Sequence, residues 1–189
     1  KPEDMYINIP LANHHRDILI KDVLISNNEN YKEKILSQLW TSYKKRANYF
    51  TNVYKLVEDV LSLNTRSITE LNVYALKKVN DYLNIPFDYE IFSEMNLAID
   101  EVHDSGEWAL NISKALNASE YVNPPGGIEL FDKEKFYQND IALKFLRINL
   151  KPYNQKKAKF IEGLSIIDVM MFNDILTVRE MLDDYEIIQ

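Results

Sequence analysis

The sequence predicts an α/β protein made of a single domain, with a helical N-terminal half and a β-α-β-α-β parallel-sheet core. The chain has 189 residues, which is enough for one substantial hydrophobic core. Residues 30–84 show helical spacing of apolar side chains, whereas residues 87–189 alternate short β-branched runs with amphipathic stretches. Apolar residues make up 46% of the chain and charged residues 27%, as in ordinary globular proteins.

The chain is expected to begin with two paired strands. Residues 5–9 (MYINI) and 18–25 (ILIKDVLI) are short aliphatic runs separated by a polar loop, a pattern typical of strands. Asn30 and Glu33 then resemble a helix N-terminal cap, and a helix of about four turns follows. Residues 51–63 predict a second helix.

A third helix is expected to begin at a capping box formed by Ser67 and Glu70, and to run to about Leu83. Pro86 ends this helix, because its ring disfavours helical geometry at the preceding residue. The pattern then changes to short runs typical of strands, which marks the start of the predicted core.

The predicted core contains strands at 87–92, 119–123 and 141–148. A helix at 106–117, expected to be capped by Ser105, connects the first two strands. A strand, helix and strand of this length imply a right-handed crossover and parallel pairing.

A short helix is expected after Asp132, which is a good N-cap residue. Phe131 and Phe136 stand on either side of the cap, at the two positions of a hydrophobic staple. Two more helices are expected, at 165–172 and 176–183.

Composition excludes several classes of function. The chain has no cysteine, which excludes disulfides, thiolate zinc sites and a cysteine nucleophile. Its net charge of -7 disfavours nucleic acid as a partner, because nucleic-acid binding needs a basic domain or stripe. The sequence shows neither a signal peptide nor an apolar run long enough to span a membrane, so it predicts a cytoplasmic protein without a membrane span.

The stretch YVNPPGGIELFD, residues 121–132, contains two of only four glycines, against roughly thirteen expected at average usage. Gly126 and Gly127 follow a predicted parallel strand, at the strand end where ligands bind in open α/β sheets. Glycine permits positive φ and a close approach of backbone N–H groups to a phosphate or oxyanion. The alternative is an ordinary tight turn between a strand and a helix.

Residues 163–174 (GLSIIDVMMFND) predict a buried helix, because almost no polar face remains. Ser165 and Asp168 fit a capping box at its start. If this end faces the PPGG segment, the hydroxyl and carboxylate would lie in a low-dielectric setting suited to general acid or base chemistry. The capping and functional interpretations are compatible.

The three histidines do not predict a metal site, because no second ligand stands at a fixed helical spacing from any of them. His103 lies in an acidic run that is typical of a solvated loop. Two small groups of basic residues, one around Lys44 to Arg46 and one around Lys151 to Lys159, stand out against the acidic background. They fit either a nucleotide diphosphate or an acidic carrier protein, or simply a solubilising surface.

The sequence resembles the WbqC-like family, which is found in bacterial O-antigen and other surface-polysaccharide gene clusters. The resemblance rests on YVNPPGG, on Tyr153, Gln155 and Phe160, and on LSIIDVMMFN at 164–173. Earlier segments fit as well, so the resemblance covers nearly the whole chain: Pro10, YKKRANYF at 43–50, YLNI at 82–85, the Ser93–Glu94 pair and ISKALNASEYVN at 112–123.

The resemblance implies a sugar-modifying enzyme of surface-polysaccharide biosynthesis, which transfers an acyl or aminoacyl group to an activated amino sugar. Its partners would be a nucleotide-linked or lipid-linked sugar and an acyl or aminoacyl donor, while any cofactor is left open. Asp168 and Ser165 are the predicted catalytic residues, with Asp168 as the base. The predicted substrate-binding residues are Asn123, Gly126, Gly127, Tyr153, Gln155 and Asn173. The alternative is a non-catalytic sugar-binding or assembly component of the same pathway.

The chain departs from the family pattern at its start. Family members begin with a segment resembling HQPxYFPxxGFFxK, then a DDVQ-like strand and an NRN element, and the printed sequence has none of these. The first residue is Lys1, so an N-terminal segment is expected to be missing. Any chemistry that depends on the His, Gln and Asp of that segment would then be absent from this chain.

Overall fold

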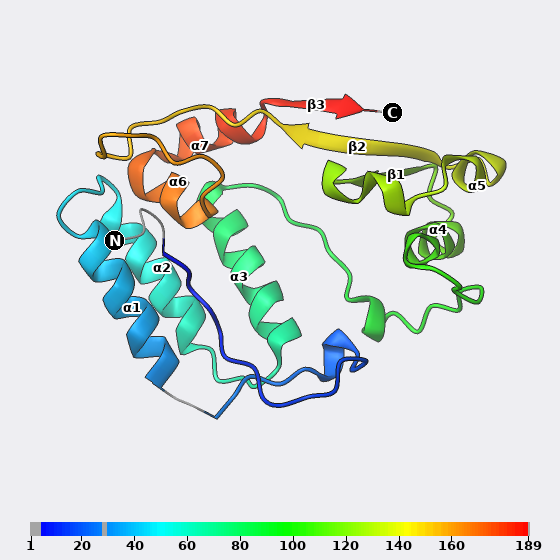
Figure 1. Ribbon diagram of the computed structural model, residues 1–189, viewed down its shortest axis with the longest axis horizontal. Coiled ribbons are helices and arrows are strands. Elements are labelled where there is room, and N and C mark those ends of the chain that lie inside the picture. Colours follow the sequence, from blue (N-terminus) through cyan, green and yellow to red (C-terminus); the bar gives the residue numbers. More distant parts are fainter. Residues whose placement is uncertain (1–4, 28–29, 189) are drawn as a thin grey trace. The chain divides into compact units, whose positions relative to one another are not determined.

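The computed structural model describes residues 5–27 and 30–188 and is mixed α/β, which confirms the predicted fold class (Figure 1). The chain divides into two compact units, each built from two separate segments. The first unit comprises Lys1–Asp88 and Leu150–Met181, and the second comprises Tyr89–Asn149 and Leu182–Gln189. These units interleave along the sequence, and the single-domain organisation stays a prediction.

The first unit is helical. Its N-terminal segment contains α1 (Asn30–Tyr43), α2 (Phe50–Ser62) and α3 (Ile68–Leu83), as the apolar spacing predicted. Helices α1 and α2 lie side by side, and α2 also contacts α3 and α6 (Ile166–Phe172) (Figure 1). Helix α2 is therefore the central element of this unit.

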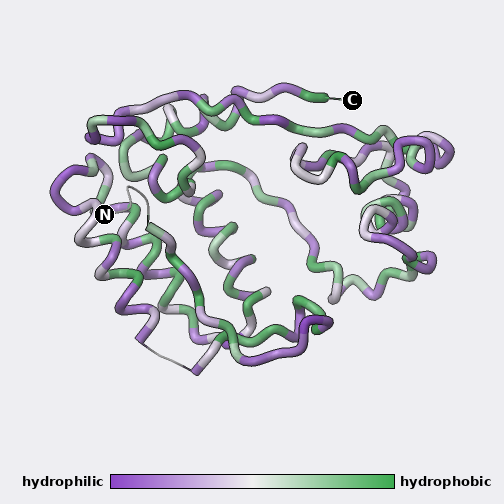
Figure 2. Tube along the Cα trace, in the orientation of Figure 1, coloured by the Kyte–Doolittle hydropathy of each residue, from purple (hydrophilic) through white to green (hydrophobic). Residues whose placement is uncertain are grey.

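The core of the first unit forms where the apolar faces of the helices meet. Ile35 and Leu39 of α1 pack with Val57 and Leu61 of α2, and all four side chains are buried. The helices alternate hydrophobic and hydrophilic residues along the chain, as Figure 2 shows for α1 and α2. Burial of each such side chain contributes roughly 1.5–3 kcal/mol relative to exposure.

The two strands predicted near the N-terminus are wrong. The described part of this segment contains a short 3₁₀ helix, η1 (Ile20–Asp22), and two isolated bridges, Leu11 to Ile25 and Leu24 to Ser67. Ile25 is buried against the helices, and its N–H donates to Arg66 O at 2.7 Å. The aliphatic run is thus explained by packing on α2 and α3, without a continuous strand partner.

The second unit is built on a three-stranded mixed sheet with the order β1-β2-β3. Strand β1 (Glu120–Asn123) pairs in parallel with β2 (Ala142–Ile148), as predicted. The third strand is β3 (Tyr185–Ile188), which pairs antiparallel with β2 and had no counterpart in the sequence prediction. The last α-helix before it, α7 (Ile175–Leu182), matches the predicted one.

The strand predicted at 87–92 is wrong. This segment is irregular and ends in the 3₁₀ helix η2 (Phe92–Glu94). Tyr89 and Phe92 are exposed, so its aromatic side chains do not form the buried face that a core strand needs. The predicted parallel β-α-β-α-β arrangement is therefore replaced by one parallel pair and one antiparallel strand.

Local capping signals locate the helices of the second unit. Helix α4 (Ser105–Ala115) is capped by Asp104, whose Oδ1 accepts from the N–H groups of Gly106 and Glu107, so the cap lies one residue before the predicted Ser105. Helix α5 (Lys133–Gln138) is capped by Asp132 as predicted.

The predicted staple around α5 is also confirmed, since the rings of Phe131 and Phe136 lie 6.1 Å apart. Phe136 packs with Leu110 and Ile141 in the buried core of the second unit. Phe145 of β2 is fully buried and contacts the Phe131 ring at 5.8 Å. The staple therefore joins α5 to the sheet.

The backbone of α4 passes so close to the backbone at Leu130 that only glycine fits at position 106. A Cβ at this position would overlap the carbonyl oxygen of Leu130, at the end of the 3₁₀ helix η3 (Pro125–Leu130). At Gly126, by contrast, an added Cβ would meet no atom within 4 Å, and φ is not positive. The two glycines offer a matched pair for testing the contact between α4 and η3.

We expect Gly106→Ala to lower the free energy of unfolding by about 1–3 kcal/mol, because one of the two backbones must shift. Gly126→Ala should change it by less than about 1 kcal/mol, in the stabilising direction, since alanine restricts the unfolded chain. Urea unfolding followed by circular dichroism measures both. Equal effects of the two substitutions would contradict the close approach at Gly106.

Candidate functional site

Asp168 forms the centre of a buried polar cluster in the first unit. Its carboxylate is only 3% exposed, and three side-chain groups donate hydrogen bonds to it. Tyr43 Oη donates to Oδ2 at 2.7 Å, and Tyr153 Oη donates to Oδ1 at 2.6 Å. Gln155 Nε2 adds a third bond to Oδ1 at 3.2 Å. Buried carboxylates need such partners, since removal from water is otherwise costly.

These groups come from three separate parts of the chain. Tyr43 is the last residue of α1, Tyr153 and Gln155 lie in the irregular segment before α6, and Asp168 lies in the first turn of α6. Tyr43 and Asp168 are 125 residues apart in sequence. The hydrogen bonds therefore tie two helices and a loop together.

Gln155 also fixes the loop in which it lies. Its side chain is 3% exposed, and its Oε1 accepts from the N–H of Ile161 at 2.9 Å. Its Nε2 lies 2.9 Å from the carbonyl oxygen of Ile161 and 3.2 Å from Tyr153 Oη. The amide thus closes the loop from 155 to 161 and positions it beside Asp168.

Arg46 places a positive charge against the aromatic side of this cluster. Its Nε donates to Ser42 O at 2.6 Å, and its Nη1 donates to Gln155 O at 3.1 Å. The guanidinium carbon lies 5.2 Å from the centroid of the Tyr43 ring and 5.4 Å from that of Phe172, within the range of cation–π attraction. We call the group of Tyr43, Arg46, Tyr153, Gln155 and Asp168 the Asp168 cluster.

Both tyrosines of the cluster have raised pKa values. Burial, followed by the hydrogen bond to Asp168, raises the pKa of Tyr43 well above its ordinary value of 10.0. The same two causes raise the pKa of Tyr153. Both hydroxyls therefore stay protonated at neutral pH and act as donors to the carboxylate. The two tyrosines remain partly exposed, so they are the members through which the cluster meets solvent.

The cluster leaves the Asp168 carboxylate able to accept few further hydrogen bonds. A carboxylate has about four lone-pair positions, and the three donors leave room for one more bond, at Oδ2. Tyr153 Oη donates to Asp168 and can itself accept a hydrogen bond, so a proton that arrives at this hydroxyl can move inward to the carboxylate. The geometry suits a proton relay or the rigid positioning of a bound hydroxyl or amine.

The structure brings three of the predicted site residues together: Asp168, Tyr153 and Gln155. Ser165 serves as the N-cap of α6, where its Oγ accepts from the N–H of Ile167 at 3.3 Å, so its predicted capping role is confirmed. The Asp168 carboxylate, the other member of the predicted capping box, instead accepts from the side chains of the cluster. Asn173 ends the same helix, and its Nδ2 donates to Val169 O at 2.8 Å. Ser165 and Asn173 thus have structural contacts at the two ends of α6.

The other predicted site residues lie in the second unit. Asn123 Oδ1 accepts from Tyr121 Oη at 3.1 Å, and its Nδ2 donates to Pro124 O at 3.0 Å. Gly126 and Gly127 lie in η3, and neither has a positive φ. The PPGG segment therefore forms a 3₁₀ turn after β1, a conformation that does not need the left-handed freedom of glycine.

The sequence prediction missed the site roles of Tyr43 and Arg46. Tyr43 continues the helical spacing of Ile35 and Leu39 in the first predicted helix, and Arg46 belongs to a small basic group. The available signal was the predicted burial of Asp168, because a buried carboxylate requires hydrogen-bond donors and a nearby positive charge. Spacing could not identify those donors, since they lie far away in sequence.

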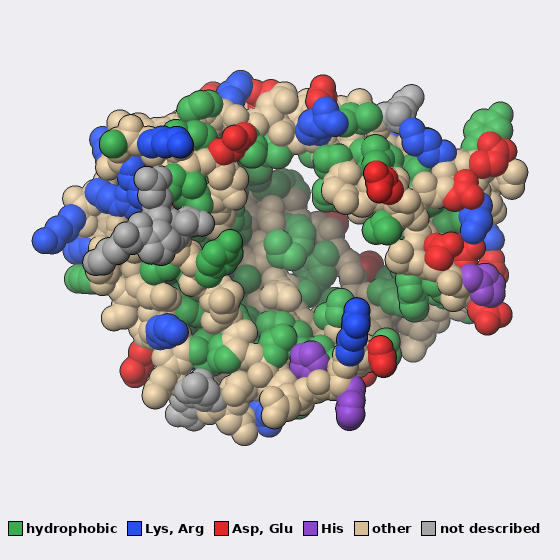
Figure 3. Space-filling view, in the orientation of Figure 1, with side chains coloured by type: hydrophobic (Ala, Val, Ile, Leu, Met, Phe, Trp, Pro, Cys, Tyr) green, Lys and Arg blue, Asp and Glu red, His purple; other side chains and the backbone are tan. Residues whose placement is uncertain are grey.

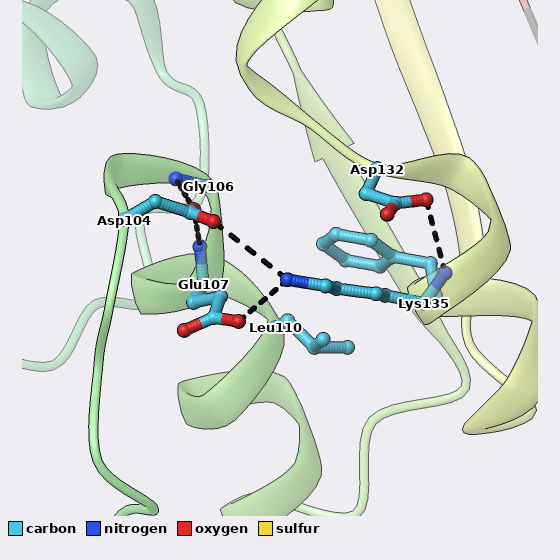
Figure 4. Close-up of a pocket in the computed structure, with 7 residues that line it drawn as sticks. Asp104, Gly106, Glu107, Leu110, Asp132 and Lys135 are labelled. Carbon is cyan, nitrogen blue, oxygen red and sulfur yellow. Dashed lines mark hydrogen bonds and ion pairs between the residues drawn. The ribbon is translucent and has the colours of Figure 1, made fainter.

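A second group of charged residues surrounds a small pocket in the second unit (Figure 4). Lys135 Nζ lies 2.6 Å from Glu107 Oε1 and 3.7 Å from Asp104 Oδ2, so its charge is already paired. The Glu107 and Asp104 carboxylates raise the pKa of Lys135, and the two ion pairs link α4 to α5. Within residues 5–27 and 30–188, no group of three or more histidine, aspartate or glutamate side chains is arranged to hold a metal ion.

Comparison with known proteins places this buried-carboxylate α/β protein in a family. The chain belongs to the WbqC-like protein family, whose model matches residues 1–180, including both units up to α7. Membership indicates a protein associated with polysaccharide gene clusters. No curated protein and no solved structure matches the chain. Among the described helices, none combines the length and the apolar character needed to cross a bilayer.

We expect Tyr43→Phe and Tyr153→Phe each to lower the free energy of unfolding by about 1–2 kcal/mol, because each removes one hydrogen bond to a charged, buried group. The double variant should lose less than the sum of the two, since both bonds serve one carboxylate. Urea unfolding at neutral pH measures all three. A strictly additive result would show that the two hydroxyls act independently.

The same tyrosines predict a loss of stability at alkaline pH. Above their ordinary pKa of 10.0, the unfolded state releases protons that the folded state keeps. The stabilisation is therefore complete below about pH 10 and is lost as pH rises toward the folded pKa values. From about pH 10 upward, stability should fall more steeply in the wild type than in the double phenylalanine variant. Parallel curves would contradict this assignment.

Proposed function

We propose that this protein is a sugar-modifying enzyme of bacterial surface-polysaccharide (O-antigen) biosynthesis, which transfers an acyl or aminoacyl group to an activated amino sugar. Membership in the WbqC-like family supports the polysaccharide context. The observation that carries the proposal is the Asp168 cluster, in which a buried carboxylate contacts two partly exposed tyrosine hydroxyls at 2.6 and 2.7 Å.

In this proposal, the amine of the sugar attacks the acyl carbon of the donor. A new C–N bond forms, the bond from the acyl carbon to the donor's leaving group breaks, and the amine loses a proton. Tyr153 Oη accepts that proton while its own proton moves to Asp168, so the carboxylate acts as the base through the tyrosine. Tyr43 and Gln155 hold the carboxylate in place by hydrogen bonds to its two oxygens.

A second candidate is a non-catalytic sugar-binding or assembly component of the same pathway. It is favoured by the burial of Asp168, which is 3% exposed and hydrogen-bonded by three side chains of its own protein. In this candidate, the carboxylate orders the surrounding aromatic side chains and takes no part in a reaction. Tyr43 and Tyr153, which are partly exposed, would then offer ring faces and hydroxyls to a sugar.

We expect turnover when the purified chain is incubated with a nucleotide-linked amino sugar and an acyl or aminoacyl thioester, with the N-acylated sugar detected by mass spectrometry. Tyr153→Phe should lower the rate by about 10²-fold or more, because it interrupts the path to Asp168. Asp168→Asn should lower it by at least as much.

The control is Tyr137→Phe, which removes an exposed hydroxyl in the second unit and should leave turnover unchanged. Isothermal calorimetry with the sugar substrate separates chemistry from binding: an enzyme with the proposed relay keeps its affinity when Tyr153 is replaced. Saturable sugar binding without product from any donor would favour the non-catalytic candidate. Unfolded Asp168→Asn protein would restrict the test to Tyr153→Phe.

A further inference from the structure

Two short segments of the first unit carry basic side chains and no acidic ones. Residues 41–50 contain three basic residues and residues 150–161 contain four, whereas the whole chain has 29 acidic and 22 basic residues. The basic residues of these segments are Lys44, Lys45, Arg46, Lys151, Lys156, Lys157 and Lys159. Such a separation of charge is unusual in a protein with a net charge of -7.

The structure joins the two segments, although they lie more than 100 residues apart. Arg46 Nη1 donates to the carbonyl oxygen of Gln155 at 3.1 Å, so the loop after α1 touches the residue that precedes Lys156. Figure 3 shows Lys and Arg side chains gathered over this end of the first unit. We define the basic patch as Lys44, Lys45, Arg46, Lys156, Lys157 and Lys159.

Three lysines of the patch have no carboxylate partner among the described residues. Some lysines elsewhere in the described chain are paired with carboxylates, as in Lys77 with Asp81 and Lys114 with Asp100. Within the described part of the chain, Lys45, Lys156 and Lys159 are exposed and form no ion pair. The positive potential of the patch is therefore available to an anion from solution.

Two features give the patch a defined shape. Arg46 is held by its two backbone hydrogen bonds and by two aromatic rings, which leaves N–H groups of the guanidinium for a further acceptor. On the other segment, Lys156 adopts a left-handed φ of 53°, and its N–H donates to Asn154 Oδ1 at 3.0 Å. The lysines thus follow a fixed turn instead of a flexible tail.

We propose that the basic patch binds the diphosphate group of a diphosphate-linked sugar, and that the sugar itself lies toward the Asp168 cluster. The inference rests on the proposed function and deepens it by naming the substrate class. Arg46 belongs to both the patch and the cluster, so a diphosphate bound there lies next to the hydroxyl-bearing rings. A guanidinium flanked by lysines matches the charge and geometry of two linked phosphates. The acidic remainder of the chain disfavours a long polyanion such as nucleic acid.

Binding of inorganic pyrophosphate tests the patch directly, without any assumption about catalysis. We expect the triple variant Lys45→Gln, Lys156→Gln, Lys159→Gln to weaken pyrophosphate binding by about tenfold or more in calorimetry, because three nearby charges are lost. The affinity of the wild type should also fall as salt is raised. The matched control is Lys21→Gln, Lys34→Gln, Lys55→Gln, which removes the same charge from exposed positions of the first unit.

The control should change the affinity by less than about twofold. Equal weakening by both triple variants, or no measurable pyrophosphate binding by the wild type, would overturn the proposal. So would binding of an acidic acyl carrier protein that depends on the patch while pyrophosphate does not compete. Equal thermal unfolding of the two variants excludes misfolding as the cause.

Two sources could present this diphosphate, and two probes distinguish them. Uridine diphosphate represents a nucleotide-linked sugar, and detergent micelles that contain a short polyprenyl diphosphate represent a lipid-linked one. The probe that binds more tightly identifies the group that carries the sugar, nucleotide or lipid. Its binding must also be weakened by the patch variant and not by the control variant. Failure of the transfer reaction with patch-dependent pyrophosphate binding intact would reject the proposed enzyme activity and leave the binding site standing.

Discussion

The constraint on which the first unit depends is the burial of the Asp168 carboxylate. A charge removed from water must be compensated by the protein, and here the compensation comes from two tyrosine hydroxyls and one amide. One donor lies at the end of α1 and two lie in the loop at 153–155, so the carboxylate on α6 is fully hydrogen-bonded only when both segments pack against this helix. Burial of one polar group thus specifies the arrangement of three segments.

The same network explains why chemistry and architecture coincide in this unit. Arg46 offsets the negative charge from the aromatic side and also holds Gln155, which in turn closes its own loop onto Ile161. Removal of any one of these groups leaves another polar atom without its partner. The residues that present hydroxyls and positive charge to solvent are therefore kept in position by contacts that also stabilise the fold.

Sequence patterns predicted the features that depend on neighbouring residues. Ser67 and Asp132 cap their helices, and Phe131 with Phe136 forms the staple, because these interactions span only a few positions. The strand at 87–92 failed for the opposite reason, since a strand exists only when a distant segment pairs with it. For the site, the motifs indicated Asp168, Tyr153 and Gln155, but no local pattern could assign Tyr43, 125 residues before Asp168, as a partner.

The interleaving of the two units has a consequence for synthesis of the chain. The first unit needs residues 150–181 and the second needs residues 182–189, so neither is complete when only the first 149 residues have been made. A fragment that ends after residue 149 contains the first segment of each unit and the second segment of neither. Folding is thus expected to be dominated by long-range contacts, which slow the search for the native state.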